Sequence, residues 1–548
     1  MKKFLLLFSL VFSQLVFTQT LLAQDASEES AYPQDYLKAD FHKQRREALR
    51  SMMPPNSVAV FFANAVRNRA NDVDYLYHQD PDFYYLTGYL EPHAVLLVFS
   101  DDQPSPEGKK YNEAIFVQKR NARAEMWTGR RLGVEGVKEK LGFDMVFNGE
   151  DFKAFETSLT ELNRVFFFNF KNDVRDTPDN ADLYSLIETF KEKAEFPEDF
   201  DAVKEEIYQK MREDDMASAQ QTARFIAYQA RLKPSLLQDK HIKAFLEAEN
   251  EEAKQMVKAS IPPPTHNLDA FSLGGMMATL REVKSPEEIE LLRKAVDISC
   301  IGQVEVMKAM HEDMSETEIQ GIHEFVFKKY GAEYEGYPSI VGAGANGCVL
   351  HYITNNKMRV GNELVLMDLG AEYRGYTADV TRTIPANGKF TKEQKAIYDL
   401  VYEAQEASFK YCKPGQPISI TTEISREVIN EGLTKLGLID SPDAEHNYFP
   451  HGVSHHIGLD VHDRGNYVNF EPNMVLTVEP GIYIPPGSPC DEKWWGIGVR
   501  IEDDILITED GYELLSDMAP RKSDEIEKMM KQESIFSKFS LPSIDQKD

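Results

Sequence analysis

Two aspartates in an otherwise apolar segment are the first residues of this chain whose spacing could support chemistry. Asp368 and Asp379 lie eleven positions apart in LVLMDLGAEYRGYTADVTRTIP, a pattern that predicts a strand, a turn at Gly375 and a returning strand. We therefore expect the two carboxylates on neighbouring strands. A carboxylate buried in such a strand must be ion-paired or bound to a metal ion. A single buried Asp is more often a cap or an ion-pair partner; two at matching depth are less easily explained in this way, but the pair alone does not decide for a metal site.

Histidines are concentrated in one short segment further along the chain. Four of the thirteen histidines fall within twelve residues, in HGVSHHIGLDVHD. Neutral imidazole binds metal ions and also carries protons near neutral pH. The glycines argue against the helical H-E-x-x-H zinc motif. A His-rich surface loop is the alternative interpretation, but GLDV is typical of an ordered, partly buried segment. The four residues are His451, His455, His456 and His462.

Two more carboxylates lie at strands or strand ends. Glu479 ends the apolar run MVLTV and is followed by the turn Pro480-Gly481. In GIGVRIEDDILI, Arg500 and Glu502 are two positions apart and would share one face of a strand. A lone buried Glu would more often pair with such an Arg. Four carboxylates with one histidine instead match an oxygen-rich two-metal site, and such hard ligands favour Mn²⁺ or a similar divalent ion.

These residues belong to a predicted second domain that spans residues 281–533. It opens with REVKSPEEIELLRKAVDISC, in which Ser285 can cap a helix, Pro286 suits the first helical position and Glu288 follows three residues after the cap. From there to Leu515, predicted helices alternate with short strands and Gly-rich turns. The carboxylates and histidines would be positioned by these strands and turns.

An α/β domain is predicted before it, over residues 40–275. The apolar runs VAVFFA, HAVLLVFS, AIFVQ and RVFFFNF predict buried strands with helices between them. Residues 185–260 are rich in Glu and Lys at helical spacing, which predicts helical additions to this domain, and IPPPT is a stiff segment after them. The additions could reshape the entrance of the site, form an oligomer contact or only cover the surface. Residues 534–548 are polar and predict a flexible tail.

Composition excludes some classes of partner. The chain of 548 residues is long enough for two substantial domains or three small ones. It carries 61 Lys and Arg against 90 Asp and Glu, a net charge of −29, which repels phosphate groups and argues against nucleic acid or an anionic membrane as partner.

The four cysteines include no C-x-x-C pair, so neither a disulfide scaffold nor a Cys-based zinc site is expected. If the chain is exported, the formation of one or two disulfide bonds is the alternative.

The N-terminus predicts export. MKK is followed by the apolar run FLLLFSLVFSQLVF and by small residues near Ala23, the pattern of a signal peptide over residues 1–23. The run is too short and too interrupted by Ser and Gln for a spanning helix, although an uncleaved anchor is the alternative. No later segment predicts a membrane span. The mature chain is therefore expected to be periplasmic or secreted.

The motifs together resemble a known family. DLGAEYRGYTADVTRT, HGVSHHIGLDVHD, TVEPGIY and VRIEDD resemble the metallopeptidases with the pita-bread fold, and the resemblance extends upstream through YPSIVGAGANGCVLHY to KSPEEIELLRKA. NDVDYLYHQDPDFYYLTGYLEPHAVLLVF and AEMWTGRRLG narrow it to aminopeptidase P, the Xaa-Pro aminopeptidases. About two thirds of the chain is covered. The resemblance implies an α/β N-terminal domain followed by an α+β pita-bread (creatinase/aminopeptidase) domain.

The resemblance also implies an activity and a ligand set. The chain would remove the N-terminal residue from peptides with proline at the second position, through a hydroxide activated between two divalent ions, with Mn²⁺ as the first candidate. Asp368 and Asp379 would be carboxylate ligands, with Asp379 bridging the two ions, and His455 would be the single imidazole ligand. Glu479 would bind one ion and act as the general base, and Glu502 would bridge both ions.

Five further residues acquire roles from the resemblance. His351, His451 and His462 resemble the family's substrate-contacting and proton-handling histidines, and His351 and His462 would act with the general base in catalysis. Arg500 would orient the carboxylates, and Tyr337 would border the substrate pocket. The fourth histidine of the cluster, His456, matches no family role.

Two other functions stay open as alternatives. A prolidase shares the ligand set but prefers Xaa-Pro dipeptides, whereas DFYYLTGYLEP and Ser454 in the histidine motif are more similar to the aminopeptidase. Methionine aminopeptidases lack the N-terminal domain. A non-catalytic binding module of the same fold would lack ligands, but all five ligand positions are filled here. A homo-oligomer, with a dimer favoured, is the expected assembly.

Overall fold

The computed structural model describes residues 33–105, 108–213, 219–538 and 541. It comprises an N-terminal unit, Met1–Lys38, whose described residues form no helix or strand, and a second unit, Ala39–Asp548, with all the described helices and strands. The predicted signal peptide and most of the predicted tail lie outside the described residues. Across the part of the chain that is described, no helix is both long enough and apolar enough to cross a bilayer.

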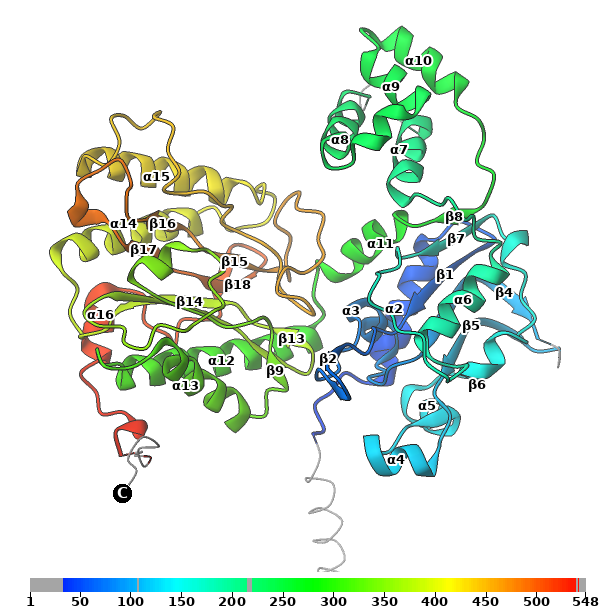
Figure 1. The fold of residues 1–548 in the computed structure, drawn as a ribbon, viewed down its shortest axis with the longest axis horizontal. Helices are drawn as coiled ribbons and strands as arrows, with labels where there is room; N and C mark the ends of the chain where they lie inside the picture. Colours follow the sequence, from blue (N-terminus) through cyan, green and yellow to red (C-terminus); the bar gives the residue numbers. More distant parts are fainter. Residues whose placement is uncertain (1–32, 106–107, 214–218, 539–540, 542–548) are drawn as a thin grey trace, which may run out of the picture. The chain divides into compact units, whose positions relative to one another are not determined.

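A six-stranded mixed sheet forms the core of the first part of the second unit (Figure 1). The runs predicted as strands coincide with four of its members, and each run is continuously apolar because the strand is buried. Side chains of the sheet and of helix α6 share one hydrophobic cluster. In spatial order the strands are β6 (Val146–Asn148), β5 (Lys110–Val117), β4 (Val95–Pro104), β1 (Ser57–Phe62), β7 (Arg164–Phe167) and β8 (Leu268–Asp269).

Short helices and a hairpin surround this sheet. Helix α3 begins after Asp80, whose side chain accepts from the N–H of Phe83, and it ends at Gly88, whose φ of 69° permits the left-handed cap. The remaining elements are α2 (Ala39–Met52), α3 (Pro81–Thr87), α4 (Ala122–Thr128), α5 (Gly133–Leu141), α6 (Leu183–Lys193), β2 (Asn68–Ala70) and β3 (Val73–Asp74).

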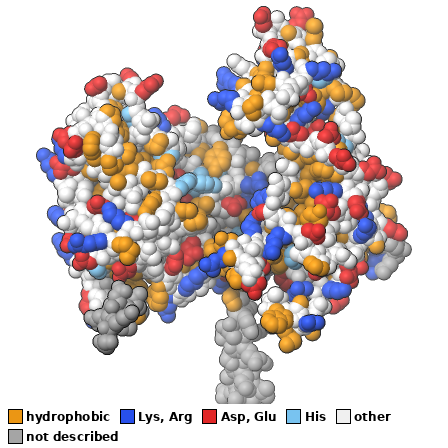
Figure 2. Space-filling model, viewed as in Figure 1, with side chains coloured by type: hydrophobic (Ala, Val, Ile, Leu, Met, Phe, Trp, Pro, Cys, Tyr) orange, Lys and Arg blue, Asp and Glu red, His pale blue; other side chains and the backbone are white. Residues whose placement is uncertain are grey.

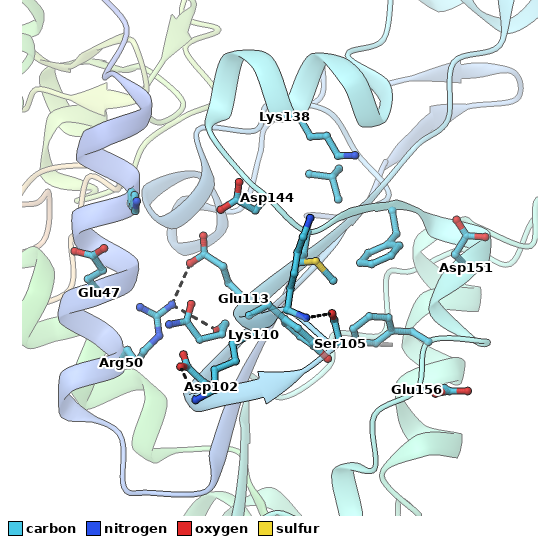
Figure 3. A pocket seen from close by; sticks show the side chains of 18 of the residues that line it. Glu47, Arg50, Asp102, Ser105, Lys110, Glu113, Lys138, Asp144, Asp151 and Glu156 are labelled. Atoms are coloured by element: carbon cyan, nitrogen blue, oxygen red, sulfur yellow. Dashed lines mark hydrogen bonds and ion pairs between the residues drawn. The ribbon is translucent and has the colours of Figure 1, made fainter. Parts of the chain in front are cut away.

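A surface hollow of about 1110 Å³ lies between α2, α5 and the strands β5 and β6. Figure 3 shows charged side chains of both signs around it, among them Arg50, Lys110 and Glu113. Arg50 Nη2 donates to Glu113 Oε2 at 3.0 Å, and Lys110 Nζ lies 3.7 Å from Asp102 Oδ2. These four charged side chains therefore pair with one another, and the hollow contains none of the predicted site residues.

The predicted helical additions divide into two parts. Helix α6 packs into the core of the sheet through Leu186 and Phe190. The following helices instead form a unit with its own hydrophobic cluster, which includes Met211, Ile226 and Phe245. We call this the helical unit; it consists of α7 (Ala202–Glu213), α8 (Ala219–Leu232), the 3-10 helix η3 (Pro234–Gln238), α9 (Lys240–Glu247) and α10 (Glu251–Ser260).

Helices and short antiparallel sheets alternate in the C-terminal part, as predicted. Its first long helix, α12, starts with the predicted capping box, because Ser285 and Glu288 exchange side-chain and backbone hydrogen bonds. Strands lie between the pair α12 and α13 on one side and the pair α14 and α15 on the other (Figure 1). The helices are α11 (Ser272–Arg281), α12 (Pro286–Ala309), α13 (Glu316–Lys329), α14 (Lys392–Phe409), α15 (Ile420–Leu436) and α16 (Ser523–Met529).

The strands of this part form two three-stranded sheets, a hairpin pair and a small three-stranded ribbon. One sheet has the order β10 (Ile340–Ala343), β11 (Leu364–Leu369), β14 (Val380–Pro385), and the other β15 (Val475–Val478), β18 (Asp503–Ile507), β19 (Tyr512–Leu514). The pair is β16 (Gly481–Ile484) with β17 (Ile497–Arg500). The ribbon contains β13 (Tyr376–Thr377), β12 (Ala371–Tyr373) and β9 (Tyr334–Glu335).

Two details bear on the sequence predictions. All four cysteines have free thiols; Cys300 and Cys412 are buried, whereas Cys348 and Cys490 are partly exposed. At the start of the predicted tail, residues 535–538 form a 3-10 helix, and the ring of Phe536 packs edge-on against Phe325 at 5.5 Å. The chain is therefore ordered a few residues beyond the predicted boundary at 534.

Candidate metal centre

The two aspartates predicted first lie next to each other in the structure. Asp368 is in β11, opposite Thr381 of β14, and Asp379 directly precedes β14. The predicted turn is present at Gly375, although it closes an additional hairpin, β12–β13, inserted between the two strands. The hydroxyl of Tyr337 lies 2.6 Å from Asp368 Oδ1 and 2.5 Å from Asp379 Oδ1, and its single proton can be donated to only one of them at a time.

Close backbone packing keeps the two carboxylates together. Gly370, two residues after Asp368, lies against the carbonyl of Ala378, the residue before Asp379. A Cβ at Gly370 would come within 1.7 Å of the Ala378 oxygen and 2.9 Å of the Tyr337 ring. Only a glycine allows this approach, so the distance between the two aspartates depends on it.

The imidazole of His455 faces three carboxylates. Its Nε2 lies 3.5 Å from Asp379 Oδ2, 3.4 Å from Glu479 Oε1 and 3.9 Å from Glu502 Oε1. Its Nδ1 lies 3.1 Å from the carbonyl oxygen of His456, which can only accept a hydrogen bond. The proton is therefore on Nδ1, and the lone pair of Nε2 points toward the carboxylates. Asp379, His455 and Glu502 each offer one ligand atom, and these atoms all lie within 4.8 Å of one another.

The remaining carboxylates come from strand ends, but not from one continuous strand. Glu479 follows β15 directly, as predicted. The prediction that Arg500 and Glu502 share one face of a strand is wrong, because β17 ends at Arg500 and β18 begins at Asp503. β17 pairs with β16 and β18 pairs with β15, so the chain changes partner at Ile501 and Glu502. Arg500 Nε nevertheless lies 3.8 Å from Glu502 Oε2.

Arg500 connects several polar groups of the site. Its Nη2 donates to Asp368 Oδ2, its Nη1 donates to the hydroxyl of Tyr483 at 3.0 Å, and its Nε donates to Thr381 Oγ1 at 3.3 Å. The Thr381 hydroxyl in turn donates to Glu502 Oε2 at 2.6 Å. The guanidinium therefore orients Asp368 directly and Glu502 through a threonine.

Sequence reasoning missed Thr381 and Tyr483. Thr381 lies two positions after Asp379, and this spacing could have indicated a side chain on the same face. Tyr483 lies in the apolar run GIYI, where its hydroxyl accepts from Arg500 and lies 2.8 Å from His451 Nε2. Nothing in its local pattern distinguishes it from a core tyrosine.

The electrostatics of the cluster fit bound cations. Burial, followed by the neighbouring carboxylates, raises the pKa of Asp379 and of Glu502 well above the usual range. Burial likewise raises the pKa of Glu479 to about 7. Among the described residues that line the site, Arg500 is the only fixed cation beside four carboxylates. Oxygen donors with this surplus of negative charge and one imidazole suit divalent ions, which would replace the protons that the carboxylates otherwise hold.

All ten residues predicted for the site line one cavity of about 640 Å³. Its wall also includes apolar side chains, among them Ile340, Leu350, Ile353 and Val461. In Figure 2, histidine side chains come to the surface together near the middle of the face shown, bordered by hydrophobic side chains. The ten are Tyr337, His351, Asp368, Asp379, His451, His455, His462, Glu479, Arg500 and Glu502.

His451 and His462 are held in neutral forms. Burial, with Arg500 nearby, lowers the pKa of His451 to about 4, and its Nδ1 lies 3.7 Å from Glu479 Oε2. Burial also lowers the pKa of His462, whose ring stands perpendicular to that of His455 at 4.4 Å. Neutral rings can both donate and accept hydrogen bonds. His351 is exposed and lines the cavity.

His456 does not belong to the cavity. Its side chain is buried, its ring packs edge-on against Tyr467 at 4.9 Å, and neither ring nitrogen has a hydrogen-bond partner within the described parts of the chain. Burial lowers its pKa to about 3. It is a core histidine, in agreement with the absence of a family role in the sequence analysis.

Two family models match the chain. The model of metallopeptidase family M24 matches residues 290–509, and the model of the aminopeptidase P N-terminal domain matches residues 42–166. The first match contains all five predicted ligands, and the second contains the strands β1, β4 and β5.

Individual relatives match over nearly their whole length. The Xaa-Pro aminopeptidase of Escherichia coli is 35% identical over 89% of this chain and 97% of the relative, and human Xaa-Pro aminopeptidase 3 is 27% identical over 87% and 82%. Among solved structures, the aminopeptidase PepP of Pseudomonas aeruginosa has a TM-score of 0.69 at 30% identity, covering 90% of this chain and 98% of that one. E. coli aminopeptidase P with the inhibitor Pro-Leu has a TM-score of 0.68 at 32% identity and the same coverage. These matches confirm the predicted fold class, an α/β domain followed by a pita-bread domain.

Proposed function

We propose two Mn²⁺ ions and a place outside the cytoplasm for this chain, which belongs to the aminopeptidase P members of metallopeptidase family M24 and is a metal-dependent Xaa-Pro aminopeptidase. The observation that carries the proposed centre is the convergence of four carboxylates and His455 on one cavity with a single fixed cation. Peptides with proline at the second position are the proposed substrates.

The residues that would hold the two ions are Asp368, Asp379, His455, Glu479 and Glu502. When bound, the ions would supply Lewis-acid chemistry, which activates the attacking water near neutral pH and stabilises the negative charge that develops on the substrate carbonyl. Arg500 and Thr381 hold the carboxylates in place, and the carbonyl of His456 holds the His455 ring.

Proton transfer is assigned to Glu479. Its carboxylate lines the cavity 3.4 Å from His455 Nε2, where it can take the proton of the attacking water and later donate it to the leaving nitrogen. An Xaa-Pro amide has no N–H, so the leaving proline nitrogen must receive this proton. His351 and His462 are the proposed partners for the substrate, because both line the cavity and are exposed to it. The apolar wall of Ile340, Leu350, Ile353 and Val461 suits the proline ring.

A peptide panel analysed by mass spectrometry tests the specificity. Purified protein, stripped of metal and reloaded with Mn²⁺, is incubated with Xaa-Pro-Pro peptides, the matching Xaa-Pro dipeptide and an Ala-for-Pro control. We expect loss of one residue from the longer peptides only. Cleavage of the dipeptide alone would assign a prolidase. No cleavage at all by protein that binds Mn²⁺ would favour a binding role.

A matched variant tests the role of Glu479. Glu479→Gln keeps the size of the side chain but can neither accept the water's proton nor carry a full ligand charge. We expect its kcat on the cleaved peptide to fall by about 10²–10⁴-fold, the range for a positioned acid–base group. Retention of more than a tenth of the activity would exclude Glu479 as the general base.

Export and assembly are proposed on the sequence. The signal-like segment 1–23 supports a periplasmic or secreted mature protein. N-terminal sequencing of protein from fractionated cells would find a mature end near residue 24 outside the cytoplasm, and a full-length cytoplasmic protein would contradict it. We also propose a homo-oligomer, with a dimer favoured. Light scattering on the purified mature chain would give its molar mass, and the mass of a single chain would contradict the proposal.

A further inference from the structure

A cluster of charged side chains is buried where helix α3 meets the end of α11 and residues 451–463, which we call the histidine-rich loop. Arg281, the last residue of α11, donates from Nη1 to Asp82 Oδ1 at 2.6 Å and from Nη2 to Asp463 Oδ1. Lys284 Nζ donates to Asp463 Oδ2 at 2.8 Å. The side chains of these four residues are at most 3% exposed. None of the four lines the metal-centre cavity, so the proposed metal binding does not itself account for them.

Asp82 is held from two directions. Arg281 binds its Oδ1, and Arg464 Nε donates to its Oδ2 at 2.9 Å. Asp82 lies in the first turn of α3, which begins at Pro81. The aspartate therefore has a fixed place in the α/β part. No described residue of that part lines the metal-centre cavity.

Asp463 is connected to the predicted imidazole ligand through the backbone. Its N–H donates to the carbonyl of His456 at 2.8 Å, and the same oxygen accepts from His455 Nδ1 at 3.1 Å. This oxygen therefore sets both the tautomer and the ring orientation of His455. Asp463 also directly follows His462 in the chain. One aspartate thus fixes both ends of the segment that runs from His455 to His462.

The loop between these histidines has little freedom to move. A Cβ at Gly458 would come within 2.1 Å of Asp463 Oδ2, so the loop packs directly on the charged cluster. The carbonyl of Gly458 accepts a hydrogen bond at 2.7 Å from the N–H of Thr377. Thr377 lies two positions before Asp379 in the chain. A displacement of Asp463 would therefore be transmitted to the loop instead of being absorbed by it.

We propose that Asp82 is a positioning residue for the metal centre. It fixes Arg281, Arg281 fixes Asp463, and Asp463 sets the orientation of His455 and the placement of His462. A buried ion cluster adds little stability over apolar side chains of the same volume, whereas it defines one geometry through its directed hydrogen bonds. The α/β part thereby contributes to metal binding without lining the site. The inference rests on the proposed metal centre.

The test is the affinity of the purified full chain for Mn²⁺, measured by competition with a chelator. Asp82→Asn keeps the shape of the side chain and one acceptor oxygen but removes one of the three carboxylate charges that pair with Arg281, the other two being those of Asp460 and Asp463. We expect the Mn²⁺ dissociation constant to rise about tenfold, the lower end of the range for partners that orient a ligand. On an Xaa-Pro-Pro peptide we expect kcat to fall by a similar factor and KM to change by less than about twofold.

Glu113→Gln is the matched control. Glu113 also belongs to the α/β part, where it pairs with the fully buried Arg46 at 2.9 Å and with Arg50 at 3.0 Å. Among the described residues, the other hydrogen bonds of these two arginines go to the carbonyls of Leu86, Phe99 and Asn112, and none goes to residues 451–463. We expect this variant to have a lower melting temperature and an unchanged Mn²⁺ dissociation constant.

Two results would overturn the inference. One is an Mn²⁺ dissociation constant for folded Asp82→Asn that equals that of the unaltered chain, and the other is an equal loss of affinity in Glu113→Gln. If Asp82→Asn does not fold, Arg464→Gln replaces it, because Arg464 is 38% exposed and its loss frees one oxygen of Asp82. A several-fold weaker affinity then supports the inference, and an unchanged one overturns it. Binding of Mn²⁺ by the unaltered chain tests the metal centre, whereas the ratio between variants tests the positioning role.

Discussion

Gly370→Ala is expected to separate the two aspartates of the metal centre without changing any ligand. The added Cβ would lie 1.7 Å from the carbonyl oxygen of Ala378, which belongs to the backbone and cannot rotate away. Cβ contacts shorter than 3.0 Å are essentially never found, so the two segments must move apart by at least about 1.3 Å, the difference between these distances. The same Cβ would press on the Tyr337 ring at 2.9 Å.

This displacement exceeds what a metal site tolerates. Binding constellations must be held within roughly 0.5 Å of their productive geometry, so a shift of this size is expected to raise the Mn²⁺ dissociation constant about 10- to 100-fold. Overpacking of a well-packed core adds a loss of about 1–3 kcal/mol in the free energy of unfolding. The affinity loss should therefore accompany a measurable fall in the melting temperature of the metal-free protein.

The assay compares chelator competition with thermal melting for the unaltered chain, Gly370→Ala and Gly275→Ala. Gly275 is the control, because it is exposed in helix α11 and a Cβ there meets nothing within 4 Å. Its replacement should leave metal affinity unchanged and stabilise the helix by about 0.5–1 kcal/mol. Unaltered Mn²⁺ affinity in folded Gly370→Ala would refute the reasoning that this glycine sets the distance between Asp368 and Asp379.

Three further predictions follow from the structure. Arg500→Lys cannot reach Asp368, Thr381 and Tyr483 together, so Mn²⁺ affinity should fall about tenfold in chelator competition; equal affinity would contradict this. In the metal-free protein the pKa of Glu479 is raised from 4.5 to about 7, so the folded chain keeps a proton that the unfolded chain has lost. The free energy of unfolding should therefore fall as the pH rises between these values. Mn²⁺ should raise the melting temperature more at pH 8 than at pH 5. Ile226→Ala, in the core of the helical unit, should cost about 2–5 kcal/mol and speed hydrogen exchange only within residues 202–260; faster exchange in the sheet would show that the unit is not independent.

Local patterns were sufficient to predict many elements of this fold. The strands β1, β4, β5 and β7 follow from continuous apolar runs, and the start of α12 follows from the spacing of Ser285 and Glu288. These signals are local because strand burial and helix capping involve residues close in sequence. The ten predicted site residues also lie together in one cavity, while their roles as ligands stay predictions.

Features that depend on distant partners were missed. The chain changes strand partner at Glu502 because β17 and β18 pair with β16 and β15, which no pattern within GIGVRIEDDILI could indicate. Likewise, α6 and α7 were predicted as parts of one helical addition, yet α6 packs on the sheet and α7 on other helices. The contact of Asp82 with Arg281 joins residues 199 positions apart, and neither residue stands out in its own segment. In each case the tertiary contact decides, and local propensity does not.

The continuity of the helical unit in sequence has a consequence for the order of folding. Its hydrophobic cluster is formed entirely by residues between 203 and 261. The metal centre instead joins Arg500 to Asp368 across 132 positions, and Arg464 meets Asp82 across 382. Closing a long loop costs more chain entropy than closing a short one, so distant contacts form later. We therefore expect the helical unit to reach its native packing early in refolding, and the metal centre to close in the last, slowest phase.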